Sequence, residues 1–177
     1  TKTAMSVTFP EMVTRNNIMR LQFLVNNGRD VYPGANYVVP LHELSKGNGA
    51  KVNMIDLKYS KMAGNTVQLK IGEIVERHLQ DGDPFLFNRQ PTLHKMSIMC
   101  HKVRILPGNT FRLNLAVTSA YNADFDGDEM NCHIPQSSIT ANEIDIMASV
   151  QHNVISPAHS SPVMGCIMDT LVAAYIM

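Results

Sequence analysis

Apolar residues recur with a helical period near both ends of the chain. The apolar positions between residues 18 and 25 form one broad stripe, which predicts a helix that Thr14 caps through its hydroxyl. Asn27-Gly28 follows, and glycine readily adopts the left-handed conformation that ends many helices. A second helix is expected from Ser138, and a third from Ser161 to the end of the chain.

Short runs of β-branched and aromatic residues fill the region between these helices. Turn residues separate the runs, among them Pro33-Gly34, the Lys-Gly-Asn-Gly of residues 46–49 and the Asp-Gly-Asp-Pro of residues 81–84. This spacing predicts a mostly antiparallel β region rather than alternating strands and helices. Strands are expected at residues 37–39, 52–57, 66–71, 74–75, 85–87, 103–106, 111–117 and 132–134. The expected fold class is therefore α+β, mainly β, with helices at the flanks.

The composition limits the classes of protein that fit this pattern. Hydrophobic residues make up 45% of the chain, and 15 basic residues balance 15 acidic ones, so the net charge is zero. Such a composition excludes a mainly disordered chain. No apolar run approaches the roughly 20 residues that a membrane-spanning helix needs, so we expect no membrane partner. Zero net charge also argues against a free-standing nucleic-acid-binding domain, because such domains carry basic patches.

The cysteines and the chain ends give two further expectations. Cys100, Cys132 and Cys166 form no Cys-x-x-Cys pair, so we expect neither a zinc site nor a disulfide framework in this segment. A reducing compartment is the simplest interpretation. The chain begins at Thr1 rather than Met and stops at Met177 inside an apolar pattern, which suggests a piece of a longer polypeptide.

A dense group of carboxylates is the clearest candidate for chemistry. Asp124, Asp126 and Asp128 occupy alternate positions, and on an extended strand the outer two would lie about 13 Å apart, too far to share an ion. Gly127 allows a sharp bend that brings them together. Converged carboxylates repel one another unless a proton or a cation joins them, and all-oxygen ligands select Mg²⁺, Mn²⁺ or Ca²⁺. A magnesium-type site is favoured, with a solvated acidic turn as the alternative.

A calcium-binding EF-hand does not fit the spacing of this cluster. An EF-hand loop that begins at Asp124 needs glycine at its sixth position and glutamate at its twelfth. The chain has Glu129 and Pro135 there. The calcium loop is therefore excluded.

Several blocks of sequence together carry a family resemblance. They are residues 122–128 (Asn-Ala-Asp-Phe-Asp-Gly-Asp), 83–95 (Asp-Pro-Phe-Leu-Phe-Asn-Arg-Gln-Pro-Thr-Leu-His-Lys), 111–114, 9–14 and 59–64. These blocks resemble the active-site region of the largest subunit of multisubunit DNA-directed RNA polymerases, and the resemblance covers in effect the whole chain. Residues 130–136 are closer to eukaryotic and large-DNA-virus enzymes than to bacterial ones, while residues 41–51 differ from the common form.

The resemblance implies a fold, a cofactor and a reaction. Residues 1–153 are expected to form a double-psi β-barrel catalytic region, incomplete in this chain, and residues 154–177 the truncated start of the helical region on the pore or funnel side. Asp124, Asp126 and Asp128 would hold a permanent catalytic Mg²⁺, and a second Mg²⁺ would arrive with the nucleoside triphosphate. The implied reaction is DNA-templated nucleotidyl transfer to the RNA 3′-hydroxyl by two metal ions.

The resemblance also implies roles for other residues and for partners. Arg89 and Asn122 match residues that contact the ribose of the incoming nucleotide, and Pro91 matches a position that shapes the active centre. The expected partners are the second-largest subunit, smaller subunits, the DNA template, the RNA transcript and the nucleoside triphosphate. The isolated chain is expected to be inactive. The expected location is the nucleus for a cellular source, and the host cytoplasm or virion for a viral one.

Two alternatives and one open set of residues remain at this point. The two-barrel RNA-dependent RNA polymerases share an Asp-x-Asp-Gly-Asp core but lack the context of residues 88–91, and a non-catalytic metal-binding or scaffolding module is the other alternative. The residues that can contact the phosphates of an RNA–DNA hybrid, or equally well lie on a solvated surface, are Arg77, Lys95, Lys102 and Arg104.

The zero net charge of the chain hides an uneven distribution of charge. Because four of the 15 acidic residues fall within residues 124–129, the rest of the chain has 15 basic against 11 acidic residues.

Overall fold

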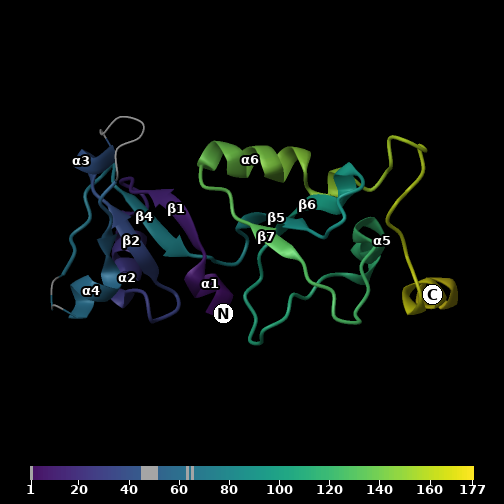
Figure 1. The fold of residues 1–177 in the computed structure, drawn as a ribbon, viewed down its shortest axis with the longest axis horizontal. Helices are drawn as coiled ribbons and strands as arrows, with labels where there is room; N and C mark the ends of the chain where they lie inside the picture. The colour runs from purple at the N-terminus through teal and green to yellow at the C-terminus, as the bar shows by residue number, and fades with distance from the viewer. Residues whose placement is uncertain (1, 45–51, 63, 65) are drawn as a thin grey trace. The chain divides into compact units, whose positions relative to one another are not determined.

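The computed structural model describes residues 2–44, 52–62, 64 and 66–177 (Figure 1). It divides into two units, the first made of Thr1–Asp83, Val103–Asn109 and Gln136–Ser138, and the second of Pro84–Lys102, Thr110–Pro135 and Ile139–Met177. In chain order the elements are α1 (Lys2–Ser6), β1 (Thr8–Met12), α2 (Ile18–Asn27), β2 (Ala35–Val39), α3 (Leu41–Leu44), β3 (Ile55–Asp56), α4 (Leu57–Met62), β4 (Ile74–His78), β5 (Pro84–Asn88), the 3₁₀ helix η1 (Lys95–Ser97), β6 (Ile98–Lys102), the 3₁₀ helix η2 (Leu115–Val117), α5 (Thr118–Tyr121), β7 (Asn131–His133), α6 (Ser138–Met147), the 3₁₀ helix η3 (Val150–His152) and α7 (Asp169–Ile176).

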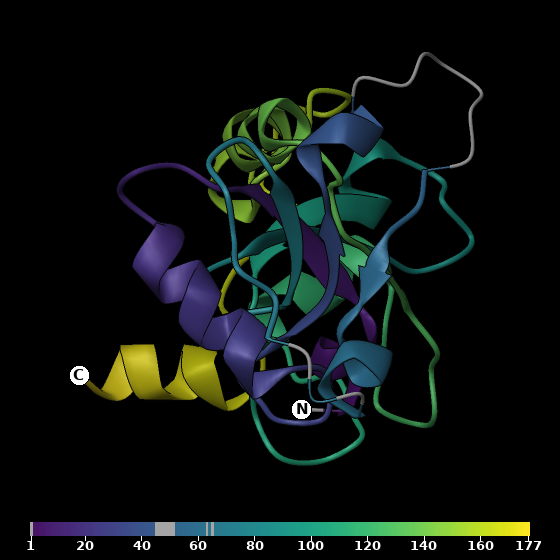
Figure 2. The same ribbon diagram turned by 90° about the vertical axis from the view of Figure 1, so that its left-hand side faces the viewer.

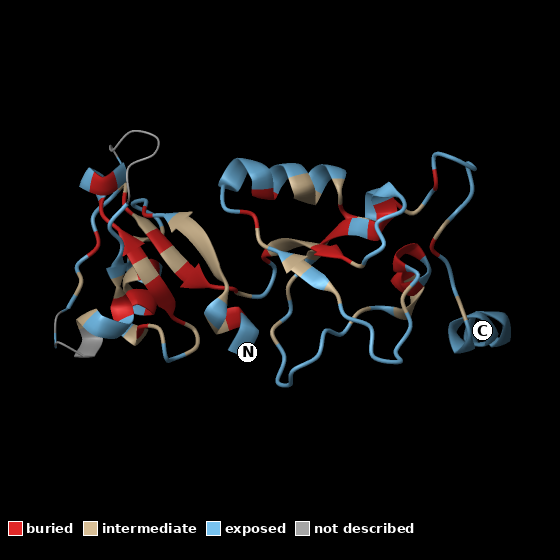
Figure 3. Ribbon diagram, in the orientation of Figure 1, coloured by how far each residue is buried: buried red, intermediate tan, exposed pale blue. Residues whose placement is uncertain are grey.

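The first unit is built on an antiparallel sheet with the strand order β1-β4-β2-β3. β4 lies inside the sheet, with Thr8 of β1 opposite His78 on one side and Val38 of β2 opposite Val75 on the other. Helix α2 packs against this sheet (Figure 2) and buries Leu21 and Leu24 there. Full burial of each such side chain contributes about 1.5–3 kcal/mol, so the amphipathic stripe of α2 accounts for its position. Figure 3 marks buried positions on α2, β2 and β4, and their apolar side chains belong to one core cluster.

A buried ion-pair network joins two strands of this sheet to the turn that follows. Arg77 on β4 is 6% exposed and donates to both carboxylate oxygens of Asp83 and, through Nε at 2.6 Å, to Glu11 on β1. Its guanidinium also lies 4.9 Å from the centre of the Phe9 ring, and Arg20 of α2 forms a second ion pair with Glu11. Although burial opposes it, hydrogen bonds from Arg77 and Arg20 hold the pKa of Glu11 below its ordinary value. The prediction that Arg77 can contact phosphates is wrong, because this guanidinium is buried between carboxylates.

Three predictions for the first unit need correction. The hydroxyl of Thr14 caps no helix: α2 begins after Asn17, whose side chain instead accepts the Thr14 N–H at 2.7 Å. Residues 66–71 form no strand. The side chain of Gln22 takes the place of a neighbouring strand, because it accepts from Leu69 N–H and donates to Val67 O. The strand expected at residues 52–57 shortens to β3, and the turn at residues 46–49 lies outside the described residues.

The second unit contains a three-stranded antiparallel sheet in the order β6-β5-β7. β5 is the middle strand, with Phe87 opposite Met99 of β6 and Cys132 of β7. Phe87 packs edge-on against Tyr121 of α5, with ring centres 5.7 Å apart, and both side chains are almost fully buried. Met96, Met99 and Met164 fill the same core, and unbranched methionines suit such irregular gaps.

In the second half of the chain, the predictions of two strands and of one helix boundary are wrong. Strand β6 lies before residues 103–106, where Val103 instead exchanges backbone hydrogen bonds with the turn at residues 81–84. Residues 111–117 form no strand, because the Asn114 side chain accepts the Ala116 N–H at 2.9 Å and starts the 3₁₀ helix η2. The last helix begins at Asp169 rather than Ser161. No helix of the described residues has the length and apolar character to cross a membrane.

The remaining predictions of the elements are confirmed. Helix α2 ends at Asn27, and Gly28 with φ 75° donates its N–H to Leu24 and Val25 carbonyls as the glycine pattern predicts. The strands expected near residues 37–39, 74–75, 85–87 and 132–134 correspond to β2, β4, β5 and β7, and the helix expected from Ser138 is α6. Because all ladders between named strands are antiparallel, the α+β class with an antiparallel β region is confirmed for the described residues.

Candidate metal centre

The three aspartates lie on the loop that runs from α5 to β7. Helix α5 ends at Asn122, which has the left-handed values φ 47° and ψ 45° that asparagine tolerates better than most residues. Ala123 donates its N–H to Thr118 O at 2.9 Å and so closes the end of the helix. Gly127 has φ 122°, a value open to glycine, and the chain turns there within the carboxylate loop.

Pairing of β5 with β7 brings the end of this loop beside a second segment. Asn88, the last residue of β5, lies opposite Asn131, the first residue of β7. Arg89 follows Asn88 directly, and Asp128 lies three positions before Asn131, so the antiparallel register places both on the same end of the sheet. The backbone N–H of Arg89 bonds to Ser97 O at 3.4 Å, which ties the start of the segment to η1.

Asp124, Asp126 and Asp128 lie close enough together to be candidates for binding one cation. Each offers one carboxylate oxygen, and these oxygens all lie within 4.8 Å of one another. Around an octahedral Mg²⁺ with ligands at about 2.1 Å, neighbouring oxygens lie about 3.0 Å apart and opposite ones about 4.2 Å apart, so the carboxylates would have to draw closer together around a bound ion. All-oxygen donors and partial exposure match the carboxylate-plus-water coordination of Mg²⁺. The extended arrangement that would have separated the outer two aspartates is not the one observed.

The pKa values of Asp126 and Asp128 are shifted in opposite directions. The pKa of Asp126 is raised, first by a hydrogen bond with the side chain of Asp124 and then by the negative charge of Asp124. The pKa of Asp128 is lowered, mainly by the hydrogen bonds from Arg89 and also by the N–H of Asp124. A bound cation would relieve this repulsion between like charges, and its binding here stays a prediction.

Arg89 is the predicted site residue that the structure brings into contact with the carboxylates. Its Nε donates to Asp128 Oδ2 at 2.7 Å and its Nη2 to Asp128 Oδ1 at 3.2 Å. The two side chains are 19% and 20% exposed. Its Nη1 also reaches Tyr121 O at 3.4 Å, at the root of the carboxylate loop. The forked geometry is the one that arginine, and not lysine, offers to a carboxylate.

Comparison with known proteins identifies the family of this chain. The family described as RNA polymerase Rpb1, domain 2, matches residues 1–150 of the chain. The chain belongs to this family. The DNA-directed RNA polymerase III subunit rpc1 of Dictyostelium discoideum is 46% identical to it over 174 residues, which are 98% of this chain and 11% of that protein. The resemblance to a polymerase largest subunit is thereby confirmed, and the chain spans about a tenth of the length of this relative.

The other two predicted nucleotide-site residues of this Rpb1 domain 2 chain do not touch the carboxylates. Asn122 is exposed and lies two positions before Asp124, where it ends α5. Pro91 is also exposed, follows a cis peptide bond and accepts the Leu93 N–H at 3.1 Å. Within the described residues, neither forms a hydrogen bond to the three carboxylates. Both therefore remain predictions about contacts with a nucleotide.

Sequence reasoning missed the residue that anchors the carboxylate loop in this domain. Tyr121, directly before Asn122, is 2% exposed, and its hydroxyl lies 2.7 Å from Nε2 of His101 on β6. Burial raises the pKa of Tyr121 and lowers the pKa of His101, so both side chains are neutral near pH 7. His101 is therefore a hydrogen-bonding residue. The signal for Tyr121 was an aromatic residue placed immediately before the motif.

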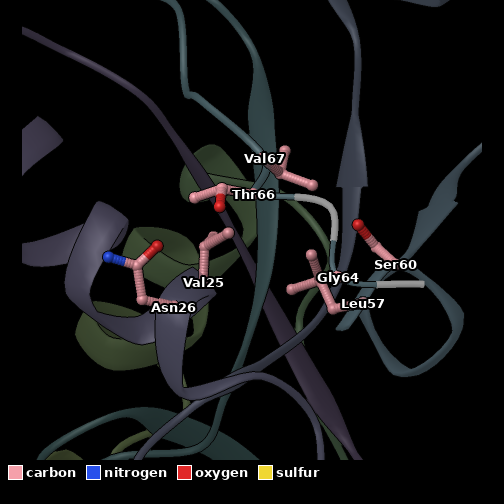
Figure 4. A pocket seen from close by; sticks show the side chains of 7 residues that line it. All are labelled: Val25, Asn26, Leu57, Ser60, Gly64, Thr66 and Val67. Carbon is pink, nitrogen blue, oxygen red and sulfur yellow. The ribbon is translucent and has the colours of Figure 1, made fainter. Parts of the chain in front are cut away.

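The first unit contains a pocket whose lining residues differ in kind from those of the carboxylate loop. Its volume is about 340 Å³. Its lining residues, all in the first unit (Figure 4), are Val25, Asn26, Leu57, Ser60, Gly64, Thr66 and Val67. The lining contains no carboxylate, histidine or cysteine, so the pocket supplies no strong metal ligand. The carboxylate loop of the second unit is the site that carries the functional argument.

One lysine and the three cysteines considered in the sequence lie in the second unit. Lys102 pairs with Asp145 of α6 at 3.0 Å, with both side chains well exposed, so its charge is partly satisfied within the chain. Cys100 is buried, Cys132 is half-buried and Cys166 is exposed, and all three are free thiols. Burial raises the pKa of Cys132 to about 11, which keeps this thiol protonated and unreactive near neutral pH.

Proposed function

We propose that this chain is the part of a DNA-directed RNA polymerase largest subunit that carries the catalytic carboxylates. The observation that carries the proposal is the convergence of Asp124, Asp126 and Asp128 on one loop, in a chain of the Rpb1 domain 2 family. In the assembled enzyme the chain would serve DNA-templated nucleotidyl transfer from ribonucleoside triphosphates to the RNA 3′-hydroxyl. The polymerase name of the 46% identical relative supports the same assignment.

Asp124, Asp126 and Asp128 would hold Mg²⁺ in this proposal. Bound there, Mg²⁺ would supply Lewis-acid activation of the RNA 3′-hydroxyl and, with a second Mg²⁺ brought by the triphosphate, stabilisation of the leaving pyrophosphate. The contribution of the chain is to hold the three carboxylates close together. The buried side chain of Tyr121 anchors the start of their loop, and Gly127 allows the loop to turn.

Arg89, Asn122 and Pro91 would shape the place of the incoming nucleotide. Arg89 presents a planar set of N–H donors at the edge of the carboxylates, which suits a ribose hydroxyl or a phosphate oxygen. The exposed amide of Asn122 both donates and accepts, so it can bind a 2′-hydroxyl. Pro91 has no side-chain donor, so its role would be to hold the backbone after Arg89 in place.

The finer architecture and the partners belong to the same proposal. The antiparallel sheets are compatible with an incomplete double-psi β-barrel over residues 1–153, followed by a helical region from residue 154. The second-largest subunit and smaller subunits would complete the enzyme around DNA and RNA. The expected location is the nucleus, because the relative is named a polymerase III subunit.

Substitution of Asp126 tests the proposed function. In the assembled polymerase, Asp126→Ala should lower RNA synthesis by more than about 100-fold, because it removes a carboxylate from the charge-stabilising site. Assembly, followed by co-purification of the other subunits, should be unchanged because the side chain is exposed. Asp145→Asn, at an exposed carboxylate on α6, is the matched control and should leave synthesis near normal. Near-normal elongation by Asp126→Ala would sink the proposal, as would robust synthesis by the isolated 177 residues.

A further inference from the structure

We infer that Arg89 is a built-in counter-ion of the carboxylate loop, which competes with a divalent cation for Asp128. The inference rests on the proposed function, because it concerns the cation that the three aspartates would hold. It assigns Arg89 a positioning role in addition to any contact with a nucleotide. The juxtaposition that carries it is the forked Arg89–Asp128 pair at the edge of the cluster.

The oxygens of Asp128 are largely occupied by N–H donors of the chain. Oδ2 accepts from Arg89 Nε at 2.7 Å and from the backbone N–H of Asp124 at 3.1 Å. Oδ1 accepts from Arg89 Nη2 at 3.2 Å. A carboxylate has about four lone-pair directions in all, two on each oxygen. Three are therefore used, and a cation that binds Asp128 with full strength must displace at least one N–H of Arg89 or share Oδ1 with it.

The charges of the site point in the same direction. Three aspartates carry three negative charges, and one arginine leaves a net charge of −2, which a single divalent cation neutralises. At the same time, the guanidinium repels a cation that approaches Asp128. With side chains 19% and 20% exposed, this repulsion is screened less than between fully exposed groups. Arg89 thus protects the convergent loop from its own repulsion while weakening its hold on the ion.

Arg89 can leave Asp128 without losing its place in the fold. Its backbone N–H is bonded to Ser97 O, and Nη1 reaches Tyr121 O, so the residue is fixed at the end of β5 by contacts other than Asp128. A cation that takes over Asp128 frees Nε and Nη2 for an anionic or hydroxyl-bearing ligand. By thermodynamic linkage, a ligand that draws Arg89 away must in turn tighten cation binding. Cation binding and presentation of Arg89 are then coupled steps.

Metal affinity, rather than activity, tests this competition. Bound and free Mn²⁺ would be measured by electron paramagnetic resonance in the assembled polymerase, without nucleotide, in the starting enzyme and in Arg89→Gln, Arg89→Lys and Asp126→Asn. Binding lost in Asp126→Asn defines the ion held by the aspartates. Arg89→Gln removes the charge and keeps an amide donor, whereas Arg89→Lys keeps the charge and removes the fork.

The expected result is a tighter site when the arginine charge is removed. Arg89→Gln should lower the dissociation constant of the Asp126-dependent Mn²⁺ by about twofold to fivefold at low ionic strength, and Arg89→Lys should change it less. The gain should shrink as salt is raised from about 0.05 M to 0.5 M, because salt screens the repulsion. A purely structural role for Arg89 would give no such salt dependence.

The opposite results separate this inference from the proposed function. Asp126-dependent binding that is unchanged or weaker in Arg89→Gln, with Arg89→Lys equal to it, would overturn the competition while leaving the metal site in place. No Asp126-dependent binding in the starting enzyme, at up to millimolar Mn²⁺, would overturn the metal site itself and the competition with it.

Discussion

Arg77 and Asp83 form a forked ion pair between β4 and the turn that follows it. Nη1 of Arg77 lies 2.7 Å from Oδ2 of Asp83, and Nη2 lies 2.8 Å from Oδ1. The side chains are 7% and 12% exposed, and Asp83 also accepts the Gln80 N–H at 2.8 Å. A buried guanidinium left without a carboxylate is strongly destabilising. The pair therefore holds the turn before β5, the strand that leads to Arg89.

Asp83→Asn should weaken this region while keeping its shape. The substitution removes one of the two carboxylates that neutralise Arg77, and Glu11 alone remains. We expect the free energy of local opening around β4 and residues 80–83 to fall by about 3 kcal/mol, the lower end for a broken buried pair. Hydrogen exchange of these backbone amides in the assembled polymerase, followed by mass spectrometry, measures this free energy.

The exposed pair between Lys102 and Asp145 provides the control. Its side chains are 60% and 37% exposed, so Asp145→Asn should change local opening by less than about 1 kcal/mol. Equal effects of the two substitutions, or unchanged exchange around β4 in Asp83→Asn, would mean that burial of the Arg77 pair contributes little to the stability of the turn.

His78 gives the first unit a pH-dependent stability. The side chain is fully buried, and its Nε2 lies 3.0 Å from Asn36 Oδ1, while Asn36 Nδ2 donates to Met5 O. Nε2 is therefore the protonated nitrogen, and Nδ1 finds no hydrogen-bond partner among the residues that the structure describes. Burial, and secondly the positive charge of Arg29, lower the pKa of His78 below its ordinary value. The folded state thus holds a neutral imidazole.

Stability of this sheet should fall as the pH drops below the ordinary histidine pKa of about 6.5. There the unfolded chain takes up a proton that the folded chain refuses, so the loss is at most about 1.4 kcal/mol per pH unit. Hydrogen exchange of β2 and β4 between pH 7.5 and 5, corrected for the intrinsic pH dependence of exchange, measures it. His78→Gln should flatten this pH dependence whatever it does to absolute stability. An unchanged slope in His78→Gln would assign the effect to other groups.

Sequence patterns predicted the elements whose cores are built from neighbouring residues. The apolar stripe of α2 and the aromatic run of β5 are local signals, and each element lies where its own apolar residues predicted it. Residues 66–71 have the composition of a strand but lie against Gln22, a partner 45 and 47 residues away. No local sequence pattern indicates that a glutamine side chain will take the place of a neighbouring strand, so the strand predicted at residues 66–71 could not be rejected from the sequence.

The candidate site shows the same division between local and distant information. Alternating aspartates around Gly127 predicted the convergence, because the motif and the bend lie in one short segment. The contact of Arg89 with Asp128 depends on the β5–β7 register, which pairs residues 43 to 47 positions apart, and spacing along the chain does not reveal it. The family resemblance placed Arg89 in the site but not on a particular carboxylate.

The turn at Gly127 supports a last prediction. Its φ of 122° is one that residues with a side chain rarely adopt, and an added Cβ would meet nothing within 4 Å. Strain in the backbone is therefore the only cost of Gly127→Ala, about 1–3 kcal/mol. Gly165 is a matched control, because a Cβ there also meets open space and its φ lies outside the positive range that side chains disfavour.

Gly127→Ala in the assembled polymerase should lower RNA synthesis by about 5-fold to 100-fold, because the strain shifts the loop away from the form in which the three aspartates converge. Raising Mg²⁺ should restore part of the rate, since a cation that binds only the convergent form stabilises it in proportion to its concentration. Gly165→Ala should retain the starting rate. Initial rates of templated RNA synthesis across a Mg²⁺ titration decide the matter: full activity of Gly127→Ala, or a loss that no Mg²⁺ concentration relieves, would show that convergence of this loop does not limit the reaction.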